Sequence, residues 1–245
     1  MEKARLDKII AGEGTYSRRE VRLLVRQGRV LVDGVPARSP EDKVVPEAVE
    51  FMVDGTGLHC RRYTWIMLHK PAGVLSATED GRGATVLDLL PPELRRRGLF
   101  PVGRLDKDTT GLLLLTNDGA LAHDLLSPKK HVDKCYFTRV TGQIHEEDIH
   151  RFKEGLDIGD EKKTLPADLE ILSSGEISEA KVTICEGRYH QVKRMFEAIG
   201  CKVIYLKRLS MGSLTLDPAL EKGAFRKLTE EEIAALLQPP RKEKE

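Results

Sequence analysis

Residues 103–119 read GRLDKDTTGLLLLTNDG, a polar loop that leads directly into a continuous apolar run and then a turn. The apolar run at 112–115 predicts a strand buried on both faces. Asp106 therefore lies on a loop rich in charges and hydroxyls, immediately before a rigid buried element. Because a reactive side chain needs a rigid support, this setting makes Asp106 a candidate catalytic carboxylate.

The tetrapeptide RLDK also occurs at residues 5–8, in different surroundings. There it opens a predicted helix whose apolar stripe contains Leu6, Ile9 and Ile10. Asp7 lies in the first turn, where a negative charge complements the helix dipole. We therefore expect a structural role for Asp7 and a reactive role only for Asp106.

A basic helix follows in the N-terminal segment. Ser17 and Glu20 form a capping-box pattern that predicts a helix starting at Arg18, and Gly28 is a suitable stop. One helix face then carries a stripe of like charges at Arg18, Arg22, Arg26 and Arg29. Like charges at this spacing destabilise a helix, so the stripe favours a phosphate-binding surface. Charge alone leaves nucleic-acid binding and an ordinary solvated face equally open.

Residues 3–50 show RLDKIIA, then the capped basic helix, then GRVLVDG with an Asp33-Gly34 hairpin turn. This order resembles the S4 RNA-binding domain. The resemblance implies that structured RNA, recognised by shape and backbone, contacts the N-terminal arginines Arg18, Arg22 and Arg26.

The chain organisation predicts two domains. We expect the S4-like domain over 1–50, a linker over 51–62, a second domain over 63–238 and a disordered tail over 239–245. Strands and helices mix in the second domain without regular alternation. This predicts an α+β fold, with a mainly antiparallel mixed sheet flanked by helices.

Composition excludes several classes of protein. The 245 residues carry a net charge of only +1, and 40% of them are hydrophobic, without a membrane-length apolar run or a signal peptide. The four cysteines are far apart, which argues against a metal site or a disulfide framework and suits a cytoplasmic protein. Nucleotide-binding glycine loops and a GxSxG elbow are absent. We expect neither a cofactor nor a metal.

The remaining candidates are Tyr136 on a predicted strand and a cationic cluster at a predicted helix start, with Arg188, Lys193 and Arg194. A nearby cation would keep a partly buried carboxylate ionised. Spacing alone favours the plainer alternatives: a loop cap, a core tyrosine and a solvated helix end.

Four motifs together resemble the pseudouridine synthases of the RsuA/RluB/RluE/RluF group. They are residues 103–119 above, LHKPAGVLSA at 68–77, KCY at 134–136 and EGRYHQVKRMF at 186–196. The resemblance implies that Asp106 is the catalytic aspartate, that Tyr136 stacks on a flipped uridine and that Lys193 pairs with the aspartate. It further implies RNA-contacting or supporting roles for a second set: Arg104, Arg188, His190, Gln191 and Arg194.

The last motif resembles the branch of this group that modifies bacterial 16S rRNA of the small subunit, at a uridine 516-type site. A synthase acting on 23S rRNA and a non-catalytic RNA-binding or ribosome-assembly protein are the alternatives. The expected partner is rRNA, free or within a partly assembled subunit, and the expected state is a monomer.

Overall fold

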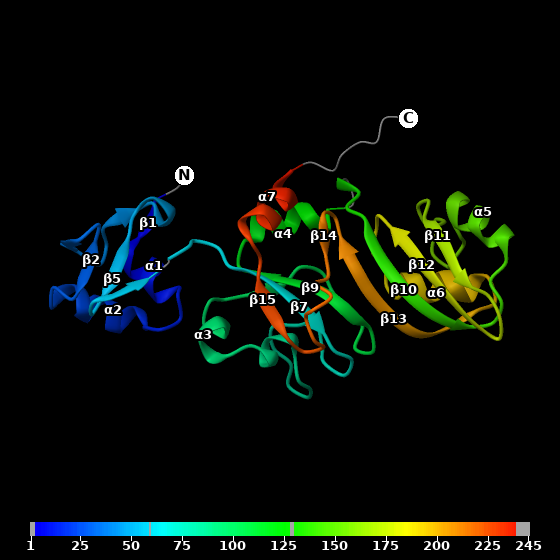
Figure 1. Cartoon of the computed structure of the whole chain (residues 1–245), viewed down its shortest axis with the longest axis horizontal. Helices are drawn as coiled ribbons and strands as arrows, with labels where there is room; N and C mark the ends of the chain where they lie inside the picture. The colour runs from blue at the N-terminus through cyan, green and yellow to red at the C-terminus, as the bar shows by residue number, and fades with distance from the viewer. Residues whose placement is uncertain (1–2, 59, 128–129, 239–245) are drawn as a thin grey trace. The chain divides into compact units, whose positions relative to one another are not determined.

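The computed structural model describes residues 3–58, 60–127 and 130–238, and the chain divides into two compact units (Figure 1). The first unit holds the residues up to Thr64 together with Leu87–Phe100 and Thr116–Asp118. The second holds Trp65–Val86, Pro101–Leu115 and the residues from Gly119 onward. The predicted tail, 239–245, lies outside the described residues. In the described part, no helix has the length and apolar character needed to cross a membrane.

Two helices of the first unit begin where the sequence predicts. Helix α1 (Leu6–Ala11) starts after Arg5, and α2 (Arg18–Arg26) starts after the Ser17 cap. Ser17 Oγ accepts a hydrogen bond from the backbone N–H of Glu20, and the Glu20 carboxylate accepts one from the backbone N–H of Ser17. This capping box satisfies two of the donors that a helix start leaves unpaired.

The first unit contains two small sheets. One pairs β1 (Ala4–Arg5) with β4 (Lys43–Val44), and the other has the order β3-β2-β5-β6, formed by Val35–Pro36, Val30–Val32, Phe51–Val53 and Thr56–Leu58. A short 3₁₀ helix, η1 (Pro46–Ala48), lies between them in sequence.

The prediction of an irregular linker over 51–62 is wrong for residues 51–58. These residues form β5 and β6, and β5 pairs with β2 in the N-terminal sheet. Phe51 and Val53 are buried while Met52 between them is exposed, which is the period-2 alternation of a half-buried strand. Asp54 and Gly55 both have positive φ and make the hairpin turn. The domain limits themselves stay a prediction.

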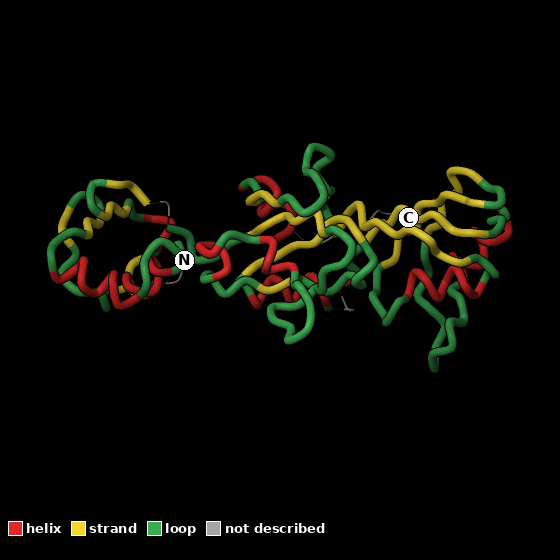
Figure 2. The backbone as a smooth tube through the Cα atoms, turned by 90° about the horizontal axis from the view of Figure 1, so that it is seen from below, coloured by secondary structure: helices red, strands yellow, loops and turns green. Residues whose placement is uncertain are grey.

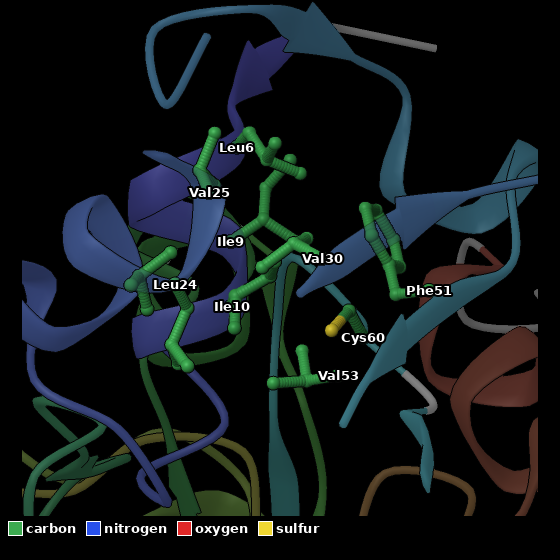
Figure 3. Close-up of a cluster of buried hydrophobic side chains, with 10 residues drawn as sticks. Leu6, Ile9, Ile10, Leu24, Val25, Val30, Phe51, Val53 and Cys60 are labelled. Atoms are coloured by element: carbon green, nitrogen blue, oxygen red, sulfur yellow. The ribbon is translucent and has the colours of Figure 1, made fainter. Parts of the chain in front are cut away.

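The core of the first unit joins the helices to this sheet (Figure 3). Leu6, Ile10 and Val21 from the helices are fully buried, as are Val30 and Val53 from the strands. Each such side chain contributes about 1.5–3 kcal/mol through burial. Because Val53 belongs to this core, the N-terminal unit needs β5 as well as residues 1–50.

The second unit is built on one large sheet with strand order β11-β12-β10-β13-β9-β7-β15, and β14 and β8 are attached to β13 and β9. In that order the main strands span Asp168–Ser173, Ile177–Ile184, Lys134–Thr141, Lys202–Met211, Thr110–Thr116, Trp65–Lys70 and Phe225–Lys227. The two attached strands are β14 (Leu214–Thr215) and β8 (Phe100–Pro101). Strand β10 is antiparallel to both its neighbours, whereas β13 and β9 pair in parallel. The predicted mainly antiparallel mixed sheet is confirmed.

The junction between β9 and β13 depends on Gly111. Its φ is +108°, and a Cβ placed on it would lie 2.2 Å from the carbonyl oxygen of Arg208. A larger residue would therefore push the two strands apart. The close approach brings the loop that precedes β9 to the middle of the sheet.

Helices α5 (Glu146–Glu154) and α6 (Gln191–Ala198) lie on the same face of the sheet beside β10–β13 (Figure 2). Phe152 and Phe196, one from each helix, pack with ring centroids 5.3 Å apart. The remaining helices are η2 (Val86–Leu89), α3 (Pro92–Arg95), α4 (Gly119–Leu126) and α7 (Glu230–Leu237). The start of α6 is thereby fixed over the sheet, next to the loop that carries Asp106.

Candidate active site

A cavity with an empty volume of about 440 Å³ lies where the loop before β9 meets the start of α6. Its lining comes from that loop, from β10, β12 and β13, and from the turn that leads into α6. The lining residues are Arg104, Leu105, Asp106, Thr109, Tyr136, Ile184, Gly187, Arg188, His190, Gln191, Val192, Lys193 and Leu206. Most of the site residues predicted for this unit therefore share one cavity; Arg194 does not line it.

Asp106 faces two basic side chains across this cavity. Lys193 Nζ lies 3.1 Å from Asp106 Oδ2, and His190 Nε2 lies 3.5 Å from Asp106 Oδ1. The Asp106 side chain is 29% exposed, so its carboxylate is partly shielded from water but still open to a ligand. The expected Asp106–Lys193 pair is present in the structure.

Lys193 also binds a second carboxylate. Its ammonium donates hydrogen bonds of 2.7 and 2.9 Å to the two oxygens of Asp108. Burial pulls the pKa of Lys193 downward, but the hydrogen bonds to Asp108 and Asp106 outweigh burial and leave the pKa raised. The bond from Lys193 in turn lowers the pKa of Asp108. Lys193 is therefore a stable cation between two anions.

The back of the loop that carries Asp106 is held by Lys70 at the end of β7. Its side chain is fully buried, and Nζ donates to the backbone carbonyls of Pro71, Asp106, Lys107 and Thr109 at 2.9–3.3 Å. Burial lowers the pKa of Lys70 to about 8, against the attraction of Asp108 and Asp106. Sequence reasoning gave Lys70 no role. The sequence signal for a buried role of Lys70 was its position at the end of an apolar strand.

Ser76 holds the residue before Asp106. Its hydroxyl donates to the carbonyl of Leu105 at 2.9 Å and accepts from the N–H of Leu105 at 3.1 Å. Gly73 N–H also donates to the carbonyl of Lys107. Together with Lys70, these bonds fix the backbone on both sides of Asp106 and leave its carboxylate facing the cavity.

Tyr136 is 7% exposed and lines the cavity from β10. Its neighbours in the lining include Ile184 from β12 and Leu206 from β13. These apolar side chains and the aromatic ring line the same cavity as the charged groups around Asp106. A planar base with polar edges and an apolar face suits this combination.

Three of the predicted RNA-contacting residues have their polar groups bound within the protein. Arg188 donates to Glu186 and to the carbonyls of Lys162 and Lys163. Arg194 donates to Asp160 and to the carbonyl of Ile158. Gln191 is 3% exposed, and its amide donates to Glu186 while accepting from the backbone N–H of Arg188.

Glu186 is the centre of this network, and sequence reasoning gave it no role. Its carboxylate binds Arg188 and Gln191 and also accepts from the backbone N–H of Leu165. The network joins the loop at 158–165 to the start of α6. These contacts position His190 and the first turn of α6, which carries Lys193.

Arg104 differs from these residues. It is exposed at the cavity, and among the described residues no hydrogen bond or ion pair engages its guanidinium. A charged group in this condition is available to a phosphate.

The predicted basic stripe of α2 is only partly free. Arg22 Nε donates to Asp7 at 3.1 Å, and Arg5 holds the same carboxylate with bonds of 3.1 and 3.0 Å. Asp7 is fully buried; burial raises its pKa, but the bonds from Arg5 and Arg22 outweigh burial and leave the pKa lowered. The structural role expected for Asp7 agrees with this geometry.

The other members of the stripe divide in the same way. Arg29 is paired with Asp54. Arg18 and Arg26 are exposed, without a hydrogen bond or ion pair in the described part of the chain. Arg18 and Arg26 are therefore the members of the stripe whose guanidinium groups have no partner in the described part of the chain, whereas Arg22 is bound through Nε.

Comparison with known proteins agrees with both units. The family described as RNA pseudouridylate synthase matches residues 64–198, and the S4 domain matches residues 4–49. An uncharacterised RNA pseudouridine synthase of Bacillus subtilis, YtzG, is 51% identical over 96% of this chain and 99% of its own length.

Two named relatives cover the chain almost as fully. The ribosomal small subunit pseudouridine synthase A of Vibrio cholerae is 43% identical over 95% of this chain and 99% of its own length. The protein of the same name from Escherichia coli is 40% identical over 95% of this chain and all of its own. A solved structure, described as the crystal structure of a pseudouridylate synthase, superposes with a TM-score of 0.68 at 37% identity, covering 95% of this chain and 99% of that one.

These matches cover both units and the cavity between the loop that carries Asp106 and α6. The chain therefore belongs to the RNA pseudouridylate synthase family, a family of isomerases that act on RNA, and it carries an S4 domain at its N-terminal end.

Proposed function

We propose that this enzyme converts one uridine of bacterial 16S rRNA, at a uridine 516-type site, into pseudouridine, with Asp106 as the catalytic carboxylate. The observation that carries the proposal is the placement of Asp106 beside Lys193 and His190, in a cavity that Tyr136 also lines. The names of the relatives from Vibrio cholerae and Escherichia coli support the small subunit as the substrate.

The reaction requires the target base to leave the RNA stack. A uridine inside a helix cannot bring its glycosidic bond to a side chain, so the nucleotide must turn outward into a pocket. Tyr136 supplies an aromatic face for the flipped base, and the exposed Arg104 supplies a cation for the backbone around it.

The isomerisation moves the glycosidic bond from N1 to C5 of the same base. The C1′–N1 bond breaks and its electron pair stays with uracil; the base then turns, a C1′–C5 bond forms, and the proton on C5 is transferred to N1. No atom is gained or lost overall. Two routes use the carboxylate of Asp106: attack on C1′, or removal of the 2′ proton to give a glycal-like intermediate.

Lys193 supports either route because it is a stable cation whose ammonium lies 3.1 Å from the Asp106 carboxylate. Lys70 and Ser76 hold the backbone of the loop, so the carboxylate does not have to reorganise when the base arrives.

Nucleotide-resolution mapping of pseudouridine in both rRNAs, from cells with and without the protein, tests the proposal. In cells that lack the protein, we expect one pseudouridine of 16S rRNA to be missing. Expression of the unaltered chain should restore this pseudouridine, and expression of the Asp106→Asn variant should not. Loss of a 23S site instead would identify the large subunit as the substrate. Complete modification of both rRNAs without the protein would support a non-catalytic role.

A further inference from the structure

The turn between β12 and α6 presents an exposed aromatic pair beside the cavity. Tyr189 is 73% exposed, although large apolar rings are normally buried. Its ring stacks on the imidazole of His190, with centroids 3.9 Å apart and an interplanar angle of 17°. His190 in turn lies 3.5 Å from Asp106. The stack therefore extends from the catalytic carboxylate to the surface.

Tyr189 is held in place by its backbone. Its carbonyl accepts a hydrogen bond of 3.1 Å from Arg194, whose guanidinium is itself bound to Asp160. The next residue, His190, has a left-handed backbone with φ 48° and ψ 32°. A non-glycine residue adopts that conformation at a cost of about 1–3 kcal/mol, which the surrounding contacts must offset. The backbone of Tyr189 is thus fixed in place, and its ring rests on the imidazole of His190.

One ring face of Tyr189 is covered by His190, and the large exposed fraction leaves the other accessible. An exposed aromatic face beside a cavity that takes a flipped nucleotide suits a second nucleobase. Unstacked bases in single-stranded RNA bind to aromatic faces in this manner. Arg104, exposed at the same cavity, provides a cation for the adjoining phosphate.

We propose that Tyr189, supported by His190, is a stacking platform for an RNA base next to the target uridine and contributes to the choice of substrate. The inference rests on the proposed function and adds a substrate contact outside the pocket. Because the ring meets a neighbouring base rather than the reacting one, it acts on substrate binding and leaves the chemical step unchanged.

The test compares Tyr189→Ala, Tyr189→Leu and Tyr189→Phe in the full chain, with a transcript of small-subunit rRNA that contains the mapped uridine. We expect Tyr189→Ala and Tyr189→Leu to raise KM about tenfold, equivalent to about 1.4 kcal/mol of lost stacking, with kcat unchanged. Tyr189→Phe should keep the KM of the unaltered enzyme, because it keeps the ring. Ile177→Ala, which removes another exposed apolar side chain of the same unit, should also leave KM unchanged.

A direct readout uses 2-aminopurine, placed one position at a time in the transcript on either side of the target. The Asp106→Asn enzyme is used because it should bind the RNA without modifying it. Binding should quench the fluorescence of 2-aminopurine at one of the tested positions. Adding Tyr189→Ala should abolish that quenching.

Three results would overturn the inference: an unchanged KM for Tyr189→Ala, a normal KM for Tyr189→Leu, or a defect confined to particles that contain ribosomal proteins. In each case the unaltered enzyme remains active. Failure of the proposed function is distinguishable, because the unaltered enzyme would then make no pseudouridine in small-subunit rRNA, either as the free transcript or within a partly assembled subunit.

Discussion

Lys193 Nζ lies 3.1 Å from Asp106 Oδ2, although the two residues belong to elements that are far apart in the chain. The start of α6 carries the cation, and the loop before β9 carries the carboxylate. The same ammonium binds Asp108 at 2.7 Å. One lysine therefore pairs with two carboxylates of the loop before β9.

Removing this cation should reduce turnover much more than RNA binding. Lys193→Met keeps the length of the side chain but leaves Asp106 and Asp108 without their shared partner. We expect kcat to fall by about 10²-fold, the usual effect of deleting one charged donor from an active site. Single-turnover conversion at saturating enzyme measures the effect. Asp108→Asn is the matched control: this carboxylate is 73% exposed, and its loss leaves the Asp106–Lys193 pair in place. Equal activity of Lys193→Met and the unaltered chain would refute the role of Lys193.

Lys70 should make stability depend on pH in the alkaline range. Burial lowers its pKa from the ordinary 10.5 to about 8, so between these values the unfolded chain binds a proton that the folded chain has released. Stability rises with pH wherever the unfolded state binds more protons. The free energy of unfolding of the unaltered chain, relative to Lys70→Met, should therefore increase from pH 8 to pH 10.5.

Denaturant unfolding of both proteins across this range measures the difference. Lys153→Met, at an exposed position of α5, should show no such trend. Activity should move in the opposite direction. When Lys70 loses its proton, the neutral amine has one hydrogen-bond donor fewer for the four backbone carbonyls that it binds. Turnover should therefore decline as pH rises through 8. A flat stability difference would contradict the assignment.

Arg188 and Arg104 should respond differently to truncation. Arg188→Ala removes the contacts that join Glu186 to the carbonyls of Lys162 and Lys163, so we expect a lower melting temperature. A loss of about 1 kcal/mol corresponds to roughly 2–4 °C in a protein of this size. Arg104→Ala should leave the melting temperature unchanged and weaken RNA binding.

Thermal unfolding and RNA titration of the same two variants separate these effects. The pattern would be contradicted by a stable Arg188→Ala protein with weak RNA binding, because Arg188 would then act on the RNA rather than on the fold.

The arginines of α2 should also separate into two groups. Arg22→Glu places a carboxylate against the buried Asp7, so it should destabilise the N-terminal unit. Arg18→Glu and Arg26→Glu should fold normally, weaken RNA binding and reduce its salt dependence by roughly one unit of slope per lost phosphate contact. Circular dichroism and binding at several salt concentrations measure both effects. Unchanged affinity of the Arg18 and Arg26 variants would remove this stripe from the RNA-binding surface.

Asp7 and Asp106 show why the same tetrapeptide serves two purposes. Asp7→Asn should lower the stability of the N-terminal unit while turnover of bound RNA continues, and Asp106→Asn should abolish turnover in a stable protein. The low pKa of Asp7 means that its stabilising effect is present above the ordinary value of 3.8 and is lost on acidification through the folded-state pKa. Unfolding at pH 3 and pH 7 measures this difference, which Asp7→Asn should abolish.

Local signals in the sequence were sufficient for several elements. The Ser17–Glu20 capping box fixed the start of α2, and the apolar run at 112–115 fixed the buried strand β9. Each signal acts within a few residues, through backbone hydrogen bonds or the burial of consecutive side chains. The strands at 51–58 were missed because each has three residues, too few to show a period clearly.

By itself, the sequence determined the two-part organisation, the family resemblance and the contrast between Asp7 and Asp106. Only the tertiary structure decided which charged groups remain free. In the folded chain, Arg188, Arg194 and Gln191 are bound to internal partners. Lys70 lies beneath the loop that carries Asp106, and Arg104 and Tyr189 are exposed. The physical reason is that a hydrogen bond or an ion pair depends on distance in space, and residues such as Lys70 and Thr109 meet only after the sheet has formed.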